Sequence, residues 1–229
     1  EGLWTHFLPA YVRAYQLVQE KALGPASHLT AAYGYPTSTS QRPRLFAKED
    51  GGVLLDIAVY PVSLALRMFG VIDNLDAEVI RNEAGVDTHV TLQAHHKNGV
   101  ISQLTASFDI LTANAAHIGC REGQLRLGPP LFGAEEVVIE RFSADGQVKT
   151  AESPLKSALK QLPLLRRLKA TLGGGGERHP YGANQYLPQM EHFVRLVEDG
   201  KQESDIVSHD LSLDVMRVIG RIRGQERVA

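Results

Sequence analysis

The fold is decided by the stretch Thr88-His89-Val90-Thr91-Leu92-Gln93-Ala94-His95-His96-Lys97-Asn98-Gly99-Val100-Ile101-Ser102-Gln103-Leu104-Thr105-Ala106-Ser107-Phe108-Asp109. Apolar and polar residues alternate on both sides of its centre, and this period of two is typical of β-strands with one buried face. Asn98-Gly99 at the centre is a strong signal for a two-residue hairpin turn, because both residue types tolerate positive φ. The stretch therefore predicts antiparallel strands at 88–97 and 100–109.

The same alternation assigns the side chains of the hairpin to two faces. One face is apolar and suited to a cover of helices; it includes Val90, Leu92, Ala94, Leu104, Ala106 and Phe108. The opposite face is mildly polar and includes Thr91, Gln93, Ile101, Gln103, Thr105 and Ser107. A solvated face and a flat contact between two subunits both fit this composition.

Related patterns extend outward from the hairpin along the chain. Short alternating or apolar runs predict further strands at 27–35, 76–82, 115–120, 124–127, 137–142 and 148–151, and Asp145-Gly146 predicts a second hairpin. Helical spacing of apolar residues predicts helices at 7–23, 185–198 and 210–223, together with one that ends at Gly70. Because hairpins dominate, we expect an α+β fold with an open, largely antiparallel sheet that helices cover on one face.

Composition limits the possible partners. The chain has 229 residues, 43% of them hydrophobic, which is enough for one substantial core. Its net charge of -2 argues against nucleic acid or an anionic membrane surface as the main partner. The basic, leucine-containing segment 156–169 favours a docked amphipathic helix or lid over a membrane-surface helix. The single cysteine, Cys120, excludes an internal disulfide and indicates a reducing, cytoplasmic location.

A second informative stretch is Gly51-Gly52-Val53-Leu54-Leu55-Asp56-Ile57-Ala58-Val59-Tyr60-Pro61-Val62. It combines a glycine turn with an aspartate and a tyrosine at helical i, i+4 spacing inside an apolar run. A carboxylate in such a setting needs a reason, because its burial is costly unless it is paired or hydrogen-bonded. Two interpretations stay open: Asp56 caps the helix that continues to Gly70, or Asp56 and Tyr60 belong to a functional site.

This stretch resembles the Gly-Gly-Gly-x-x-x-Asp-x-Gly-x-x-x-His/Tyr signature of the glucose–fructose oxidoreductase/inositol dehydrogenase (Gfo/Idh/MocA) family, and especially its dimeric dihydrodiol dehydrogenase branch. Asp50, Ala58 and His6 depart from the residues usual there. The likeness continues in separate elements along the chain: Glu1 to Tyr11, Arg44-Leu45-Phe46, Gly85-Val86-Asp87, Asn98-Gly99, Asn184-Gln185-Tyr186 and Gln189 to Phe193.

The resemblance implies an NAD(P)-dependent oxidoreductase that acts on the CH–OH group of a sugar, polyol or dihydrodiol. It implies catalytic roles for Asp56 and Tyr60, with Tyr60 orienting the substrate or relaying its proton and Asp56 holding a substrate hydroxyl or the family's catalytic lysine. Trp4 would form an apolar pocket wall, and Arg44, Asn184 and Gln185 would bind substrate. For Arg44 a surface charge, and for Asn184 and Gln185 a cap of the following helix, are alternative roles. Open sheet faces pair subunits in this family, so a homodimer is also implied.

No Gly-x-Gly-x-x-Gly dinucleotide fingerprint occurs in the chain. Gly173-Gly174-Gly175-Gly176 follows a basic segment and predicts a flexible loop rather than a phosphate-binding turn. The Glu-Lys-Pro motif that carries the family's catalytic lysine is missing as well. We therefore expect residues 1–229 to form the substrate-binding and oligomerisation domain, with the N-terminal dinucleotide-binding domain absent from this chain. NAD or NADP would serve the full-length enzyme and would not bind this chain alone.

Other chemistries find little support in the residues. His95 and His96 are adjacent and point to opposite faces of a strand, while His89 and His95 lie about 20 Å apart along it, so we expect no metal site. No Gly-x-Ser-x-Gly nucleophile motif is present. Two other classes stay open: a non-catalytic small-molecule-binding or scaffold protein of the same fold, and a lyase or hydrolase that works with this domain alone.

Overall fold

The computed structural model describes residues 2–142, 148–150 and 176–224. Its strands are β1 (Ala26–Gly34), β2 (Ile72–Arg81), β3 (Asp87–His96), β4 (Ile101–Ser107), β5 (Ala115–Cys120), β6 (Gly123–Leu127), β7 (Glu136–Phe142), β8 (Val148–Thr150) and β9 (Gly176–Arg178). Its helices are α1 (Pro9–Gln19), α2 (Val53–Asp56), α3 (Val59–Phe69), α6 (Leu187–Glu198) and α7 (His209–Gly224). Three 3₁₀ turns complete the described elements: η1 (Trp4–Phe7), η2 (Pro43–Phe46) and η3 (Leu131–Gly133).

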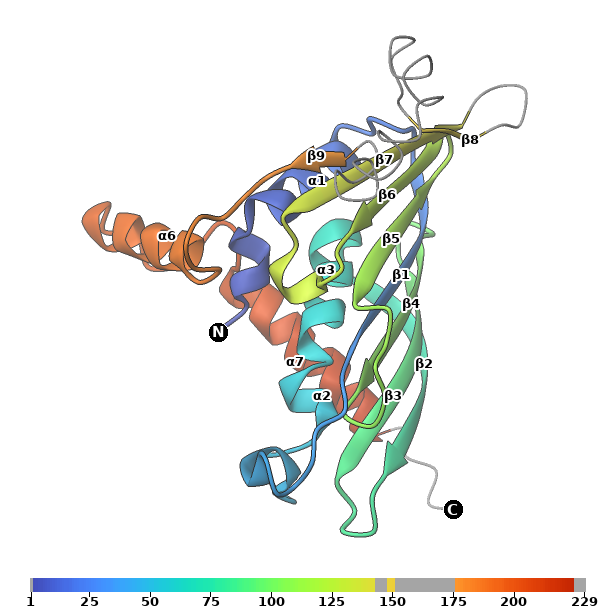
Figure 1. Ribbon diagram of the computed structural model, residues 1–229, viewed down its shortest axis with the longest axis vertical. Helices are drawn as coiled ribbons and strands as arrows, with labels where there is room; N and C mark the ends of the chain where they lie inside the picture. Colours follow the sequence, from blue (N-terminus) through green and yellow to red (C-terminus); the bar gives the residue numbers. More distant parts are fainter. Residues whose placement is uncertain (1, 143–147, 151–175, 225–229) are drawn as a thin grey trace, which may run out of the picture.

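All of these strands form one sheet, with the order β2-β3-β4-β1-β5-β6-β7-β8 and with β9 paired to β7 (Figure 1). Every neighbouring pair is antiparallel except β1 and β4, which run parallel in the register His28↔Ile101 to Gly34↔Ser107. The parallel pair arises because β1 inserts between the β3–β4 hairpin and the later strands. The expected open, largely antiparallel sheet is confirmed.

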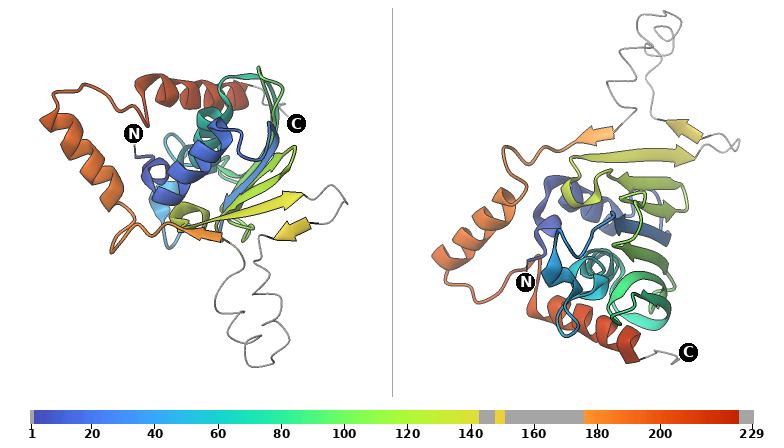
Figure 2. Two further views of the ribbon diagram at one scale, coloured as in Figure 1. Left: turned by 90° about the horizontal axis from the view of Figure 1, so that it is seen from above. Right: turned by 60° about the horizontal axis from the view of Figure 1, so that its bottom comes forward.

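The described helices that pack on this sheet all lie on the same face. Figure 2 shows α1, α3 and α7 on the same side, while α6 stands apart from the sheet. The core lies between the sheet and the covering helices, and it contains the predicted apolar residues of the hairpin: Val90, Leu92, Ala94, Leu104, Ala106 and Phe108. On the opposite face, Thr91, Gln93 and Gln103 are exposed, as the alternation predicts. Ser107 differs, because it is fully buried and its Oγ accepts hydrogen bonds from the backbone N–H groups of Asp109 and Ile110.

The turn between β3 and β4 is one residue longer than the expected two-residue loop. The backbone N–H of His96 donates to the carbonyl of Val100, and the N–H of Gly99 donates to the carbonyl of His96. Three residues, 97–99, therefore connect the paired positions, and Gly99 takes a φ of 86°. The Asn98 side chain also receives the N–H of Val100 and donates to the carbonyl of Phe69, which fixes this turn against the end of α3.

Two predictions on the remaining segments fall outside the described residues. These are the turn at Asp145-Gly146 and the basic segment 156–169, although the strands on either side of the first, β7 and β8, do pair antiparallel. Of the glycine run at 173–176, only Gly176 is described, as the first residue of β9. Among the described residues, no helix is long and apolar enough to cross a lipid bilayer.

Candidate functional site

Aromatic side chains from four elements and from the connection before α6 meet in one cluster. The ring centroids of Trp4 in η1 and Tyr60 in α3 lie 4.9 Å apart, and those of Tyr60 and Tyr33 in β1 lie 5.7 Å apart. Phe132 in η3 contacts Tyr33 at 5.6 Å, and Tyr186 before α6 contacts Trp4 at 5.1 Å. Most of these pairs meet edge to face, the arrangement that ring quadrupoles favour. We call these five residues the aromatic wall.

The indole of Trp4 has a fixed orientation within this wall. Its Nε1 donates a hydrogen bond to the carbonyl oxygen of Phe132 at 3.0 Å. A partly buried indole N–H needs such a partner, and here the partner comes from a residue 128 positions away in the chain. The predicted wall residue Trp4 is thus held between α3, η3 and the segment before α6.

A polar clamp also positions the tyrosines at the end of β1. The buried side chain of Asn114 accepts the N–H of Gly34 at 3.1 Å and donates to the carbonyl of Gly34 at 3.0 Å. Gly34 lies so close to Ser107 that a Cβ on it would approach the Ser107 carbonyl oxygen to 2.7 Å. The clamp fixes the backbone between Tyr33 and Tyr35, whose rings contact each other at 5.9 Å.

Asp56 lies next to these tyrosines as the last residue of α2, and it is half-buried. Burial raises the pKa of its carboxyl above the ordinary value, while the positive charges of Arg42 and Arg44 oppose that rise. Burial also raises the pKa of Tyr33, with smaller contributions from Tyr35, Tyr60 and Asp56. The carboxyl of Asp56 and the hydroxyls of the tyrosines therefore share one electrostatic environment, which is typical of functional sites.

The capping interpretation of Asp56 is wrong. The helix is interrupted at this point: α2 ends at Asp56, and α3 begins at Val59 with Ala58 as its N-cap. The N-cap of α3 makes no side-chain hydrogen bond, so Asp56 does not cap this helix. The predicted C-terminal end of this helix is confirmed, because α3 stops at Gly70, which takes a φ of 77°. Asp56 and Tyr60 thus come from two consecutive helices rather than from one helical face.

The remaining predicted site residues lie around this centre. Arg44 is exposed in η2, and its contribution is the charge that acts on Asp56. Asn184 accepts the backbone N–H of Tyr186 at 2.9 Å, so it stabilises the turn ahead of α6, whose N-cap is Tyr186 itself. The side chain of Gln185 lies against Gly133, next to Phe132. The structure thus places Trp4 against Tyr60 and places Asp56 near Tyr33, while the other three predicted residues lie at the margin.

Sequence reasoning missed Tyr33, Tyr35, Phe132 and Tyr186. Tyr33 has the same strand parity as the buried residues Leu29 and Ala31, which is a signal that it points toward the helices. No comparable pattern marks Phe132 or Tyr186, because Phe132 lies in the three-residue turn η3 and Tyr186 lies in the connection before α6. Their approach to Trp4 depends on tertiary packing alone.

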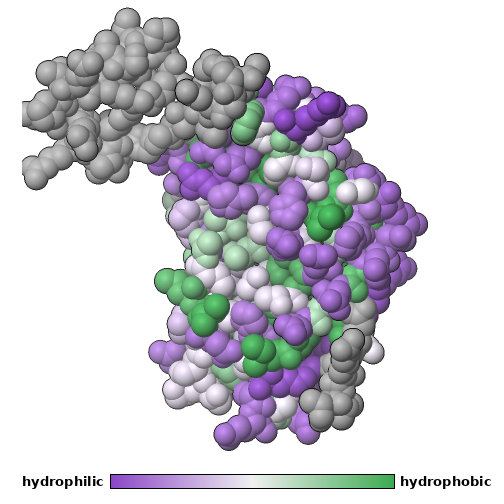
Figure 3. Space-filling view, turned by 90° about the vertical axis from the view of Figure 1, so that its right-hand side faces the viewer, coloured by the Kyte–Doolittle hydropathy of each residue, from purple (hydrophilic) through white to green (hydrophobic). Residues whose placement is uncertain are grey.

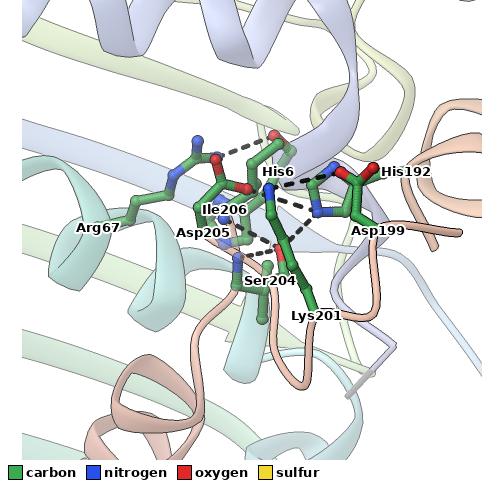
Figure 4. A network of polar contacts seen from close by, with 9 residues as sticks. His6, Arg67, His192, Asp199, Lys201, Ser204, Asp205 and Ile206 are labelled. Atoms are coloured by element: carbon green, nitrogen blue, oxygen red, sulfur yellow. Dashed lines mark hydrogen bonds and ion pairs between the residues drawn. The ribbon is translucent and has the colours of Figure 1, made fainter. Parts of the chain in front are cut away.

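A network of polar contacts surrounds the η1 turn that carries Trp4 (Figure 4). Arg67 in α3 donates to the carbonyl oxygen of His6 at 2.8 Å, and Nε2 of His6 pairs with the Ser63 hydroxyl at 2.9 Å. On the other side of η1, His192 of α6 pairs with the Ser204 hydroxyl at 2.8 Å and lies 3.6 Å from the Asp205 carboxylate. The ring of Phe7, the last residue of η1, contacts the His192 ring at 5.0 Å. The η1 turn, which carries Trp4, therefore lies between α3 and α6.

The His6 side chain is fully buried, so a positive charge on its ring is energetically unfavourable. Burial, helped by the charge of Arg67, lowers the pKa of its imidazole to about 3. The ring is thus neutral at physiological pH, and its Nδ1 has no hydrogen-bond partner. Within the described part of the chain, no group of three or more histidine, cysteine, aspartate or glutamate side chains is placed to hold a metal ion.

Comparison with known proteins places the chain in a family. The sequence model of the GFO/IDH/MocA C-terminal domain matches residues 11–126, just over half of the chain. The chain belongs to the GFO/IDH/MocA family. The match begins in α1 and ends in β6, so it includes Tyr33, Asp56 and Tyr60, and it confirms the resemblance that the sequence motifs indicate.

Individual GFO/IDH/MocA relatives are oxidoreductases. Human trans-1,2-dihydrobenzene-1,2-diol dehydrogenase is 28% identical over 143 residues, which are 61% of this chain and 42% of the relative. A dTDP-3,4-didehydro-2,6-dideoxy-alpha-D-glucose 3-reductase from Streptomyces violaceoruber is 36% identical over 140 residues, or 58% of this chain and 41% of the relative. The chain thus matches less than half the length of these curated relatives.

Solved structures share the fold at lower sequence identity. The aldose-aldose oxidoreductase from Caulobacter crescentus, complexed with glycerol, superimposes with a TM-score of 0.73 at 19% identity, covering 97% of this chain and 60% of that one. The 3-ketoreductase KijD10 from Actinomadura kijaniata, in complex with NADP and TDP-benzene, gives a TM-score of 0.72 at 18% identity, covering 99% and 62%. The α+β architecture of this GFO/IDH/MocA domain is therefore the one these oxidoreductases share.

Proposed function

We propose that residues 1–229 form the substrate-binding and oligomerisation domain of an NAD(P)-dependent oxidoreductase that acts on the CH–OH group of a sugar, polyol or dihydrodiol. The observation that carries this proposal is the placement of Asp56 and Tyr60 around Tyr33 of the aromatic wall, where both raise the pKa of the Tyr33 hydroxyl. An ionisable group with a raised pKa, a tyrosine and apolar rings are the elements of a pocket for a small hydroxylated ligand. The oxidoreductase relatives support the same reaction class.

Each residue of the site has a role in this chemistry. NAD(P), when held by another domain, would supply the hydride acceptor. The residues of this chain would handle the proton that the substrate hydroxyl must lose in the same reaction. Tyr60 would orient the substrate or relay that proton, and Asp56 would hold a substrate hydroxyl. Trp4 and the other rings of the aromatic wall would exclude water and pack on the carbon skeleton. Arg44 would bind substrate from the margin and keep Asp56 more acidic than burial alone allows.

The dinucleotide itself does not fit the residues of this chain. Its sequence contains no Gly-x-Gly-x-x-Gly, the turn that lets a backbone approach a pyrophosphate. A separate N-terminal dinucleotide-binding domain would therefore hold NAD or NADP. The exposed apolar side chains of α6 suit contact with such a domain; they are Leu187, Met190, Phe193, Val194 and Val197.

The isolated chain should bind neither NAD nor NADP, whereas the same chain joined to a dinucleotide-binding domain of a relative should bind one of them. Isothermal titration calorimetry of both proteins, with each nucleotide, checks this expectation. Dissociation constants in the micromolar range for the isolated chain would show that the nucleotide site lies within residues 1–229. The proposal that a separate domain binds the nucleotide would then be wrong.

Oxidation of a polyol or dihydrodiol with coupled reduction of NAD(P) by the joined protein tests the proposed function directly. Absorbance of the reduced nicotinamide at each turnover gives the readout. If the joined protein binds nucleotide and substrate but transfers no hydride, the chain is a non-catalytic binding domain of the same fold.

We further propose that the open face of the sheet forms a homodimer. Figure 3 shows this face, on which hydrophobic and weakly polar side chains lie among hydrophilic ones. Outward-facing residues line up across the strands in the register Asp76↔Gln93↔Gln103↔Thr30↔His117. A shallow hollow of about 560 Å³ runs over these strands. A standard dimer contact buries roughly 800 Å² per partner, and a flat sheet of this width can supply it about a two-fold axis.

A negative charge at the centre of this face should weaken the dimer. In Gln103→Glu, the new carboxylate would meet its symmetry mate or a close neighbour, so we expect the dimer dissociation constant to rise at least roughly tenfold. Analytical ultracentrifugation over a range of concentrations checks the shift. Gln16→Glu, on an exposed position of α1, is the matched control and should change nothing. An unmodified chain that sediments as a monomer at about 50 μM would contradict a sheet-face dimer.

A further inference from the structure

Asp87, the first residue of β3, is a buried carboxylate outside the candidate site. Its side chain is nearly inaccessible, with 3% of the residue's surface exposed. One oxygen, Oδ1, accepts the backbone N–H of Leu54 at 2.8 Å, and the other, Oδ2, lies 3.6 Å from the guanidinium of Arg81. A carboxylate buried this deeply is retained only where such partners compensate for lost hydration.

The glycine pair before α2 makes room for this carboxylate. Gly52 has a φ of 99°, and a Cβ on it would approach the carboxylate atoms of Asp87 to between 2.5 and 2.7 Å. The N–H of Gly52 donates to the carbonyl of Leu45 at 2.8 Å, so the turn is also fixed from its other side. The absence of a side chain at Gly52 is therefore what allows Asp87 to reach the backbone of α2.

A short chain of bonds connects Asp87 to the candidate site. Leu54, which donates to Asp87, lies in the single turn of α2 that ends at Asp56. The N–H of Asp56 in turn donates to the carbonyl of Gly52 at 3.2 Å. Asp87 stands on β3, which pairs with strands on both sides in the sheet. It thus ties the loop that carries Asp56 to the rigid part of the fold.

We propose that Asp87 is a positioning residue, which with Gly52 holds α2 so that the carboxyl of Asp56 stays half-buried beside the tyrosines. The assignment of Asp56 as a substrate-facing group rests on the proposed function; the anchoring of Asp56 by Asp87 does not. A serine or threonine cap would also satisfy the N–H of Leu54. A carboxylate adds an ion pair with Arg81 from the neighbouring strand, and so fixes α2 to two strands at once.

Two substitutions test this role from opposite sides of the contact. Asp87→Asn keeps the shape of the side chain but removes the charge and turns an amide N–H2 toward either Leu54 or Arg81. Gly52→Ala keeps the charge of Asp87 and forces the turn away from it. Ser102→Ala is the control, because it removes a fully buried hydroxyl that pairs with His96, away from α2. Asp87→Ala is avoided, because an unfilled polar cavity there risks unfolding the chain.

Two readouts by NMR on the 229-residue chain report the anchoring. We expect both Asp87→Asn and Gly52→Ala to accelerate hydrogen exchange of the Leu54 amide at least about tenfold, since a bond to a charged acceptor is lost or lengthened. We also expect the carboxyl of Asp56 to titrate at lower pH in both variants, because a loosened α2 exposes it to water. Ser102→Ala should change neither readout, even if it lowers stability equally.

The outcomes separate positioning from other roles. If only Asp87→Asn moves the titration of Asp56, the effect is that of a removed charge, and the positioning role is overturned. The positioning role is also overturned if both variants leave Leu54 exchange and Asp56 titration at the level of Ser102→Ala. Neither readout needs cofactor, substrate or hydride transfer, so a failure of the proposed reaction would leave this result standing. In an active joined protein, Asp87→Asn should lower kcat more than it changes KM.

Discussion

Replacement of Tyr60 by phenylalanine should slow the hydride-transfer step of the joined, nucleotide-binding protein by about 100-fold or more, because a positioned proton-transfer group typically contributes a factor of this size. The substitution removes one hydroxyl and keeps the ring that packs against Trp4 and Tyr33. The free energy of unfolding should therefore change by no more than about 1 kcal/mol. Single-turnover measurement of NAD(P) reduction isolates the chemical step from product release.

Tyr15→Phe provides the matched control for this experiment. Tyr15 lies in α1, where its ring receives the guanidinium of Arg67 at 4.7 Å, and it takes no part in the aromatic wall. The same loss of a hydroxyl there should leave the single-turnover rate unchanged. A Tyr60→Phe enzyme as fast as the unmodified protein would assign Tyr60 to packing alone and leave Asp56 as the remaining candidate for handling the substrate proton.

Most of the fold could be predicted because its signals are local. The alternation in the β3–β4 hairpin fixes which side chains are buried, and Gly70 ends α3 where glycine is free to take a positive φ. The parallel pairing of β1 with β4 could not be foreseen in this way. It depends on how a strand separated by more than sixty residues inserts into the sheet, and no short-range pattern encodes that.

The candidate site could be predicted only in part, for the same physical reason. Asp56 and Tyr60 stand out because polar groups in an apolar run need an explanation, and Trp4 is the only tryptophan. Residues 53–69 keep good helical spacing throughout, and the one sequence signal for the break between α2 and α3 is Pro61, which is tolerated only in the first turn of a helix. Phe132 contacts Tyr33 across about a hundred residues of sequence, and Asp87 reaches Leu54 across 33, so their roles depend on the assembled sheet.

His6 makes the free energy of unfolding strongly dependent on pH. Its pKa in the folded chain is about 3, whereas an exposed histidine in the unfolded chain titrates near 6.5. Between these two values the unfolded state binds a proton at this position and the folded state does not. Protonation therefore stabilises the unfolded chain, so the contribution of a neutral His6 is complete above pH 6.5 and is lost progressively as the pH falls toward 3.

The free energy of unfolding should accordingly fall by about 3 kcal/mol between pH 7 and pH 4 through His6 alone, at 1.36 kcal/mol for each pH unit below 6.5. Urea unfolding at both pH values, followed by circular dichroism, measures the drop. His6→Gln removes the titrating group and keeps a partner for Ser63, so the variant should lose less stability on acidification than the unmodified chain, whatever its stability at pH 7. His209→Gln, at a side chain that is 74% exposed, is the control and should retain the full drop. Equal decreases in stability for His6→Gln and the unmodified chain would mean that the buried ring can be protonated at no cost in stability. The unpaired Nδ1 of His6 and the nearby positive charge of Arg67 argue against that outcome.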